Sequence, residues 1–148
     1  LIEPTLRALE RDGLIEYRRF EGVPADRLPA EFARVDVVLD QFRMGIYSAV
    51  SVEGMAAARL VVAHLHEHTI ASARALSGLE LPIVAASPST LEQRLRDIAA
   101  DRARFAELAA AGPAYVRALH DGRVTAEVID RHLLRSGEQS THVPPAGV

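Results

Sequence analysis

The residues best suited to chemistry lie between two apolar segments, residues 35–40 and 60–65. After the first segment comes a loop with a glycine, and then a run of small residues that carries one carboxylate, Glu53. The loop residues are Gly45, Ile46, Tyr47 and Ser48. Strand, glycine-containing loop, helix and strand form the βαβ unit of nucleotide-binding α/β proteins. We therefore expect backbone N–H groups of the loop and the following helix N-terminus to face an anionic phosphate.

The rest of the sequence predicts the elements that hold this loop. Near-continuous apolar runs at residues 35–40, 60–65 and 82–86 are typical of buried parallel strands, and residues 14–20 predict a further strand of mixed alternation. Helical spacing and capping residues predict helices at residues 3–12, 29–34, 47–58, 71–76, 88–98, 102–111, 113–119 and 124–134. In the helix at 88–98, Ser87 is the expected N-cap. The fold class is thus α/β, a parallel sheet with flanking helices and a C-terminal helical cluster.

Composition limits the classes of function. Of the 148 residues, 49% are hydrophobic and 25% charged, which is typical of a globular domain. The net charge of −3 gives no reason to expect nucleic acid as a partner. The absence of cysteine excludes zinc–thiolate sites and fits a cytoplasmic location, and no apolar run is long enough for a transmembrane segment. We expect residues 1–134 to form one domain and the polar residues 135–148 a disordered tail.

The central motif resembles that of the C-terminal donor-binding domain of GT-B nucleotide-sugar glycosyltransferases of the retaining group 1, or family 4-like, type. Those proteins carry the pattern E-G-F-G-x-x-x-x-E-A-M-A-x-G-x-P-V-V, and residues 45–62 match its E-x-M-A core and final valine pair. Further similarities are the Asp40–Gln41 pair after the strand and the run at residues 81–88. Gly45 stands where the family has its first Glu, and Ser48 replaces the second loop glycine. Ala58 and Leu60 replace the Gly and Pro before the strand.

The resemblance implies a Rossmann-like half of a GT-B fold and residue roles that go with it. Glu53 would accept hydrogen bonds from the ribose hydroxyls of the nucleotide, and the Gly45–Ser48 loop would contact the diphosphate or the sugar. Gly22 and Val23 would frame the nucleobase. The partners would be a nucleoside-diphosphate sugar, an unidentified acceptor and an N-terminal domain of the same chain. The full-length protein would transfer a glycosyl group to a hydroxyl without a cofactor or metal, and the 148 residues alone would be inactive.

Two other interpretations stay open. A GT-B relative could bind a nucleotide sugar and catalyse epimerisation or phosphorolysis. Residues 1–15 also resemble the helix, glycine and strand that lead into the wing of winged-helix DNA-binding regulators, although no basic stripe accompanies them.

The histidines offer two further hypotheses. His64, His66 and His68 alternate, so on a strand all three would share one face and could bind a transition metal, or else mark a strand edge in solvent. His120 and Asp121 look like the family's His-Asp turn, for which we expect a structural role.

Overall fold

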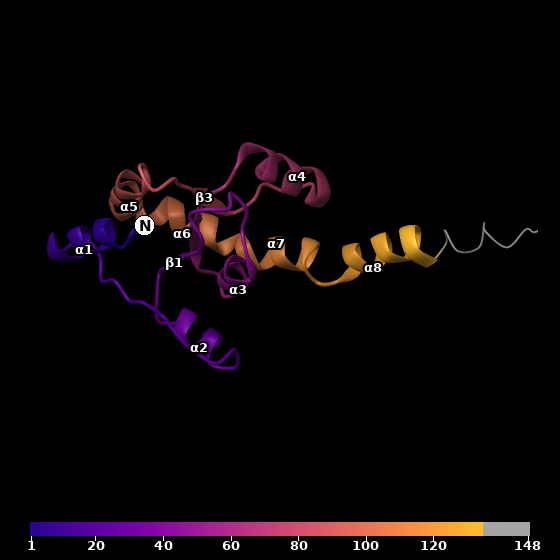
Figure 1. Ribbon diagram of the computed structural model, residues 1–148, viewed down its shortest axis with the longest axis horizontal. Coiled ribbons are helices and arrows are strands. Elements are labelled where there is room, and N and C mark those ends of the chain that lie inside the picture. The colour runs from indigo at the N-terminus through magenta and orange to yellow at the C-terminus, as the bar shows by residue number, and fades with distance from the viewer. Residues whose placement is uncertain (135–148) are drawn as a thin grey trace, which may run out of the picture.

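The sheet lies at the centre of a computed structural model that describes residues 1–134 (Figure 1). It has three parallel strands, β1 (Val37–Leu39), β2 (Leu60–Ala63) and β3 (Ile83–Ala85), in the order β1-β2-β3. Val38 pairs with Val61 and Val62 with Val84. The three apolar runs of the sequence therefore form neighbouring parallel strands, as predicted. The chain is a mixed α/β domain.

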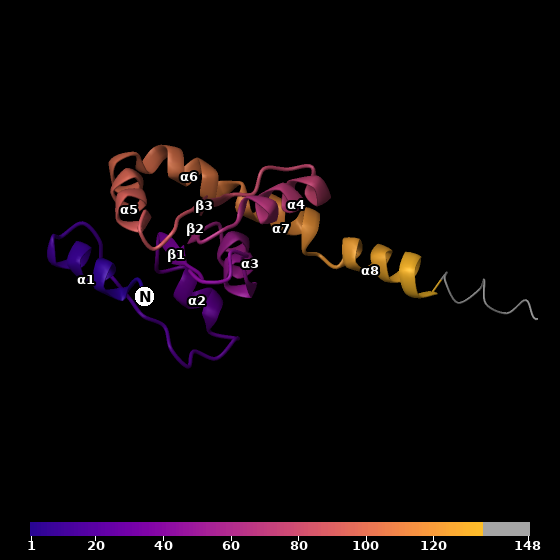
Figure 2. The ribbon, with the colours of Figure 1, turned by 45° about the horizontal axis from the view of Figure 1, so that its top comes forward.

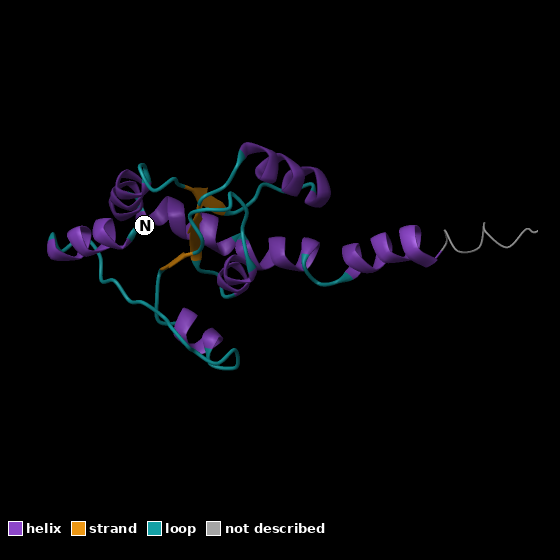
Figure 3. Ribbon diagram, viewed as in Figure 1, coloured by secondary structure: helices purple, strands orange, loops and turns teal. Residues whose placement is uncertain are grey.

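Helices cover both faces of this sheet (Figure 3). The first cluster of buried side chains joins one face to α2 (Leu28–Phe32), α3 (Ala49–Ala56), α4 (Glu67–Ser77) and α7 (Gly112–Leu119). The second joins the other face to α1 (Glu3–Arg11), α5 (Leu91–Ala100) and α6 (Arg102–Ala110). Side chains of β2 alternate between the clusters, and all four of its residues are buried because helices lie on both sides.

The C-terminal helices divide into two parts. α5, α6 and α7 pack around the sheet, as the predicted helical cluster requires. α8 (Arg123–Ile129) and the π-helix η1 (Asp130–Leu134) extend away from the sheet in both ribbon views (Figures 1 and 2). α8 buries none of its residues. The predicted tail at 135–148 lies outside the described residues.

One predicted element is wrong. Residues 14–20 form no strand, because no neighbouring strand supplies backbone partners for them. A strand needs such a partner, and the mixed alternation of this segment could not show whether one is in reach. Ile15 and Tyr17 are instead partly buried against the second cluster.

Three helix starts differ from prediction by two residues or more. α3 begins at Ala49, two residues later than expected, with Ser48 as N-cap. α4 begins at Glu67, several residues before the expected start, with His66 as N-cap. α5 begins at Leu91, since Ser87 and Thr90 bond to each other in a preceding turn (Ser87 N to Thr90 Oγ1, 2.9 Å) and Thr90 becomes the N-cap. Within residues 1–134, no helix combines the length and apolar character needed to cross a membrane.

Candidate functional site

Asp40 is the polar centre of the loop between β1 and α3. Its half-buried carboxylate accepts hydrogen bonds from the Ser48 N–H (2.8 Å), the Ser48 hydroxyl (2.7 Å) and the Ser51 hydroxyl (2.6 Å). Ser51 is fully buried, so its hydroxyl depends on this partner. Charge-assisted bonds of this kind are among the stronger hydrogen bonds of proteins. Asp40 thus fastens the N-terminus of α3 to the end of β1.

Ser48 is the N-cap of α3. Its backbone is extended (φ −113°, ψ −175°), and its side-chain oxygen accepts from the Val50 N–H at 3.2 Å. This explains the serine at the position of the family's second loop glycine, because serine is a preferred N-cap residue. The Ser48 N–H donates to the Asp40 carboxylate. This carboxylate therefore occupies the place at the helix N-terminus where we expected a phosphate. The N–H groups of Gly45, Ile46 and Tyr47 donate to no described residue.

Gln41 holds the other half of the loop. Its side-chain oxygen accepts from the N–H groups of Arg43 (2.9 Å) and Met44 (2.7 Å). Its side-chain nitrogen donates to the carbonyls of His64 (3.2 Å) and Ile46. One amide therefore ties the loop to itself and to the carboxyl end of β2.

Gly45 packs directly on the histidine that precedes α4. Its carbonyl accepts from the His66 N–H (2.8 Å) and the Thr69 hydroxyl (2.9 Å). Its φ is +69°, and a Cβ there would lie 1.7 Å from the Cδ2 of His66. Neither the backbone conformation nor the space admits a side chain. The glycine at the position of the family's Glu is therefore required by this packing.

Tyr47 connects the loop to α7. Its hydroxyl lies 3.2 Å from Nε2 of His120, and the two rings meet edge to face with centroids 5.7 Å apart. Partial burial lowers the pKa of His120. The ring centroids of Tyr115 and His120 are 6.2 Å apart. The Tyr115 hydroxyl is buried without a hydrogen bond to any described residue, and burial raises the pKa of Tyr115.

The His-Asp turn has the predicted structural character. The Asp121 carboxylate accepts from the Arg123 N–H at 3.0 Å, and this bond lowers the pKa of Asp121. Gly122 follows with φ +89°. The contact of His120 with the loop was not predicted.

Glu53 lies apart from these contacts. It is exposed, and on a helix of 3.6 residues per turn it lies roughly opposite the buried Ser51 and Met55. Its carboxylate makes no hydrogen bond or ion pair with a described residue. Exposure leaves Glu53 free to accept hydrogen bonds from a ligand, and its assignment to a ribose stays a prediction.

Gly22 and Val23 line a cavity of about 1270 Å³ together with Asp40 and Gln41. Gly45 to Ser48 and Glu53 do not line this cavity. Asp40 and Gln41 are thus the residues shared by the two candidate segments: they hold the Gly45–Ser48 loop by hydrogen bonds and form part of the cavity wall beside Gly22 and Val23. Glu53 joins neither group, and all of these residues remain candidates.

The three histidines do not share a strand. β2 ends at Ala63 and α4 begins at Glu67, so His64 follows the strand, His66 is the N-cap of α4 and His68 lies within α4. Their rings follow one another at 5.2 Å (His64 to His66) and 5.6 Å (His66 to His68). Among residues 1–134, no group of His, Cys, Asp or Glu is arranged to hold a metal ion.

Sequence reasoning missed two features of the loop. The first is Arg43, which is exposed and whose guanidinium has no ion pair among the described residues. The second is the serine pair that binds Asp40. An Asp followed after 8 and 11 positions by serines at a helix start was the available signal, since an N-cap and a buried polar residue both need partners.

Comparisons of the chain with protein-family models, with curated proteins and with solved structures found no match.

Proposed function

We propose that the carboxyl edge of this sheet binds a nucleoside-diphosphate sugar, and that the chain acts as the donor-binding half of a GT-B glycosyltransferase. The observation that carries the proposal is the Gly45–Ser48 loop. It follows the carboxyl end of β1, is held there by Asp40 and Gln41, and leaves the N–H groups of Gly45, Ile46 and Tyr47 without partners among residues 1–134. Ligands of open α/β sheets bind outside the carboxyl ends of the strands.

The chemistry follows from the charges that such a donor carries. The free N–H groups of the loop donate to the diphosphate, and the Arg43 guanidinium, exposed in the same loop, compensates negative charge that develops on the leaving group. The Asp40 carboxylate shapes the loop and does not contact phosphate. Glu53 accepts from vicinal ribose hydroxyls. Glycosyl transfer to an acceptor hydroxyl requires residues beyond those that bind the donor, so the 148 residues alone have no transferase activity.

The test is a comparison of donor binding in three variants of the full-length protein. Nucleotide sugars that raise its melting temperature identify the donor, because a ligand of the folded state stabilises it by mass action. Glu53→Ala should then weaken donor binding by about 1.5–3 kcal/mol, since a charge-assisted acceptor is lost. Glu53→Gln should lose less, because the amide oxygen still accepts.

Glu107→Ala is the matched control, since Glu107 is also an exposed helical glutamate without an ion pair among the described residues. It should bind the donor normally. Calorimetric affinities that are equal for Glu53→Ala and Glu107→Ala would contradict the ribose assignment, and no stabilisation by any nucleotide sugar would contradict the donor itself.

No observation favours the two alternatives. A wing would require a strand after Gly13, and residues 14–20 form none, while Leu6 and Leu9 of α1 are buried in the second cluster.

A further inference from the structure

His66 lies against the Gly45–Ser48 loop. Its backbone N–H donates to the Gly45 carbonyl at 2.8 Å, and the Thr69 hydroxyl donates to the same oxygen at 2.9 Å. These two bonds fix the start of α4 on the loop. The His66 imidazole fills the space that a side chain at position 45 would need, because an added Cβ would lie 1.7 Å from Cδ2 and 2.2 Å from Nε2. An imidazole nitrogen is therefore present where the loop residue itself has no side chain.

The nitrogens of this imidazole are available to a ligand. His66 is exposed, and although it is the N-cap of α4 its side chain makes no capping bond. Neither ring nitrogen has a hydrogen-bond or ion-pair partner among residues 1–134. The rings of His64 and His68 lie on either side in sequence, with centroids 5.2 and 5.6 Å from that of His66, and the His68 ring is stacked on it at 19°. The neighbouring rings thus restrict the orientation of the imidazole.

Hydrogen-bond donors surround the imidazole. Three backbone N–H groups of the adjacent loop donate to no described residue, those of Gly45, Ile46 and Tyr47. The first N–H groups of α4 have no partner within the helix, and Arg43, exposed in the loop, adds a cation. The exposed Glu67 carboxylate follows His66 and works against an anion, but the donors are more numerous. Such a set suits a ligand group with several anionic oxygens.

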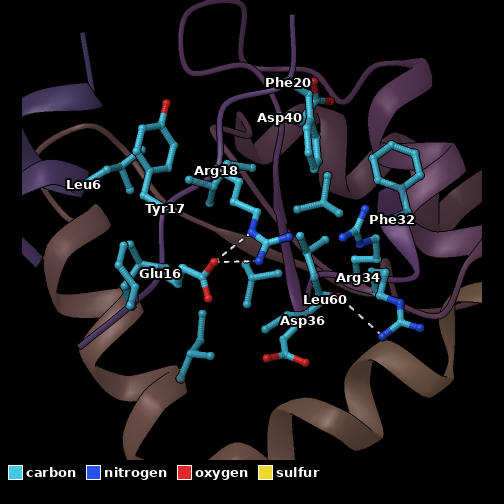
Figure 4. A pocket seen from close by; sticks show the side chains of 18 of the residues that line it. Leu6, Glu16, Tyr17, Arg18, Phe20, Phe32, Arg34, Asp36, Asp40 and Leu60 are labelled. Carbon is cyan, nitrogen blue, oxygen red and sulfur yellow. Dashed lines mark hydrogen bonds and ion pairs between the residues drawn. The ribbon is translucent and has the colours of Figure 1, made fainter. Parts of the chain in front are cut away.

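The large cavity belongs to a different part of the surface. Figure 4 shows Asp40 among its lining side chains, and none of the three histidines lines it. Asp40 also holds the loop, so the cavity and the loop adjoin at this residue. We infer that the His66 imidazole donates a hydrogen bond to the diphosphate of the donor, at the loop and not in the cavity. This inference rests on the proposed function and adds to it a binding residue from the start of α4.

Inorganic pyrophosphate is the probe, and His66→Phe in the full-length protein is the variant. Phenylalanine keeps a flat ring against Gly45 but has no N–H group. We expect calorimetry to show pyrophosphate binding that is roughly 10- to 100-fold weaker, the effect of one lost hydrogen bond to a charged group. His68→Phe is the matched control, since it makes the same replacement at the neighbouring exposed ring, and it should bind pyrophosphate like the unmodified protein. Equal affinities of the two variants overturn the inference.

Two further measurements separate ligand contact from packing. His66→Asn keeps a side-chain N–H and should bind pyrophosphate more tightly than His66→Ala, and no difference between them would overturn the contact. In nitrogen-15 NMR spectra, the imidazole signals of His66 should shift on addition of pyrophosphate more than those of His68. A role in packing alone would leave the two rings with equal shifts. Thermal denaturation without ligand verifies that each variant folds.

Nucleotide sugars distinguish this inference from the proposed function. An unmodified protein that no nucleotide sugar stabilises contradicts the proposed function, whatever the variants do. A donor that stabilises the unmodified protein and binds His66→Phe and His68→Phe equally overturns the inference alone. A donor whose binding is weakened in His66→Phe, while pyrophosphate binds that variant unchanged, places the contact on the sugar and also overturns it.

Discussion

The carboxylate of Asp40 and the hydroxyl of Ser51 lie 2.6 Å apart, and this bond joins the end of β1 to the first turn of α3. Asp40 also takes the N–H of Ser48, the residue that caps the helix. The negative charge of the Asp40 carboxylate thus lies at the N-terminus of α3, which is the positive end of the helix dipole. A carboxylate of the protein therefore stabilises the helix N-terminus, and the N–H groups of Gly45, Ile46 and Tyr47 in the preceding loop donate to no described residue.

Asp40→Ala should lower the free energy of unfolding by about 3 kcal/mol, because it removes charge-assisted bonds and leaves the buried Ser51 hydroxyl without a partner. Asp40→Asn should cost less, since one acceptor oxygen remains. Urea denaturation measures both. The control is Asp26→Asn, an exposed loop carboxylate without a partner among the described residues, which should change stability by less than about 0.5 kcal/mol. Similar losses for Asp26 and Asp40 would refute the account.

Gly45→Ala should be much more destabilising than Gly22→Ala. Both glycines have positive φ, +69° and +63°, so both substitutions carry a backbone cost of about 1–2 kcal/mol. Only at Gly45 does the new methyl group meet another residue, the His66 ring, which adds about 1–3 kcal/mol. Adding His66→Ala to Gly45→Ala should recover the second contribution and leave the first. A double-mutant cycle without such recovery would show that the close contact is absent in solution.

Removing the hydroxyl of Tyr47 should lower the stability of the fold, whereas removing the hydroxyl of Tyr115 should not. Tyr47→Phe loses the hydrogen bond to His120 and should cost about 0.5–1.5 kcal/mol. Tyr115→Phe removes a buried hydroxyl that has no hydrogen bond among the described residues, so stability should stay equal or rise. Thermal denaturation of the two variants side by side decides this. A loss for Tyr115→Phe as large as that for Tyr47→Phe would reveal a bond from Tyr115.

His120 should make the fold less stable in mild acid. Burial lowers its pKa in the folded state below the ordinary value of 6.5, so the unfolded chain binds the proton more tightly. The contribution of neutral His120 is fully present above pH 6.5 and is lost as the pH falls through the lowered folded pKa. His120→Gln should flatten this part of the stability–pH curve, measured by urea denaturation at several pH values. Parallel curves for the two proteins would exclude His120 as the titrating group.

Local patterns in the sequence were sufficient for the elements of the sheet and for the polar residues that follow its strands. Apolar runs such as residues 60–63 predict strands buried on both faces, since only the interior of an α/β domain hides every side chain of a strand. Asp40 and Gln41 were visible as polar residues at the end of such a run. Helices α6 and α7 could be predicted from spacing and from the glycine and proline between them, because these signals act within one turn.

Only the tertiary structure decided which groups meet. The contact of Gly45 with His66, the bond of Tyr47 to His120 and the separation of Glu53 from the cavity all depend on how elements distant in sequence pack. Residues 14–20 show the same limit, because a strand exists only if another backbone lies beside it at the right distance. Side-chain periodicity records which face of a segment is apolar. It does not show which distant backbone or side chain completes the hydrogen bonds of that segment, because those partners depend on how the whole chain packs.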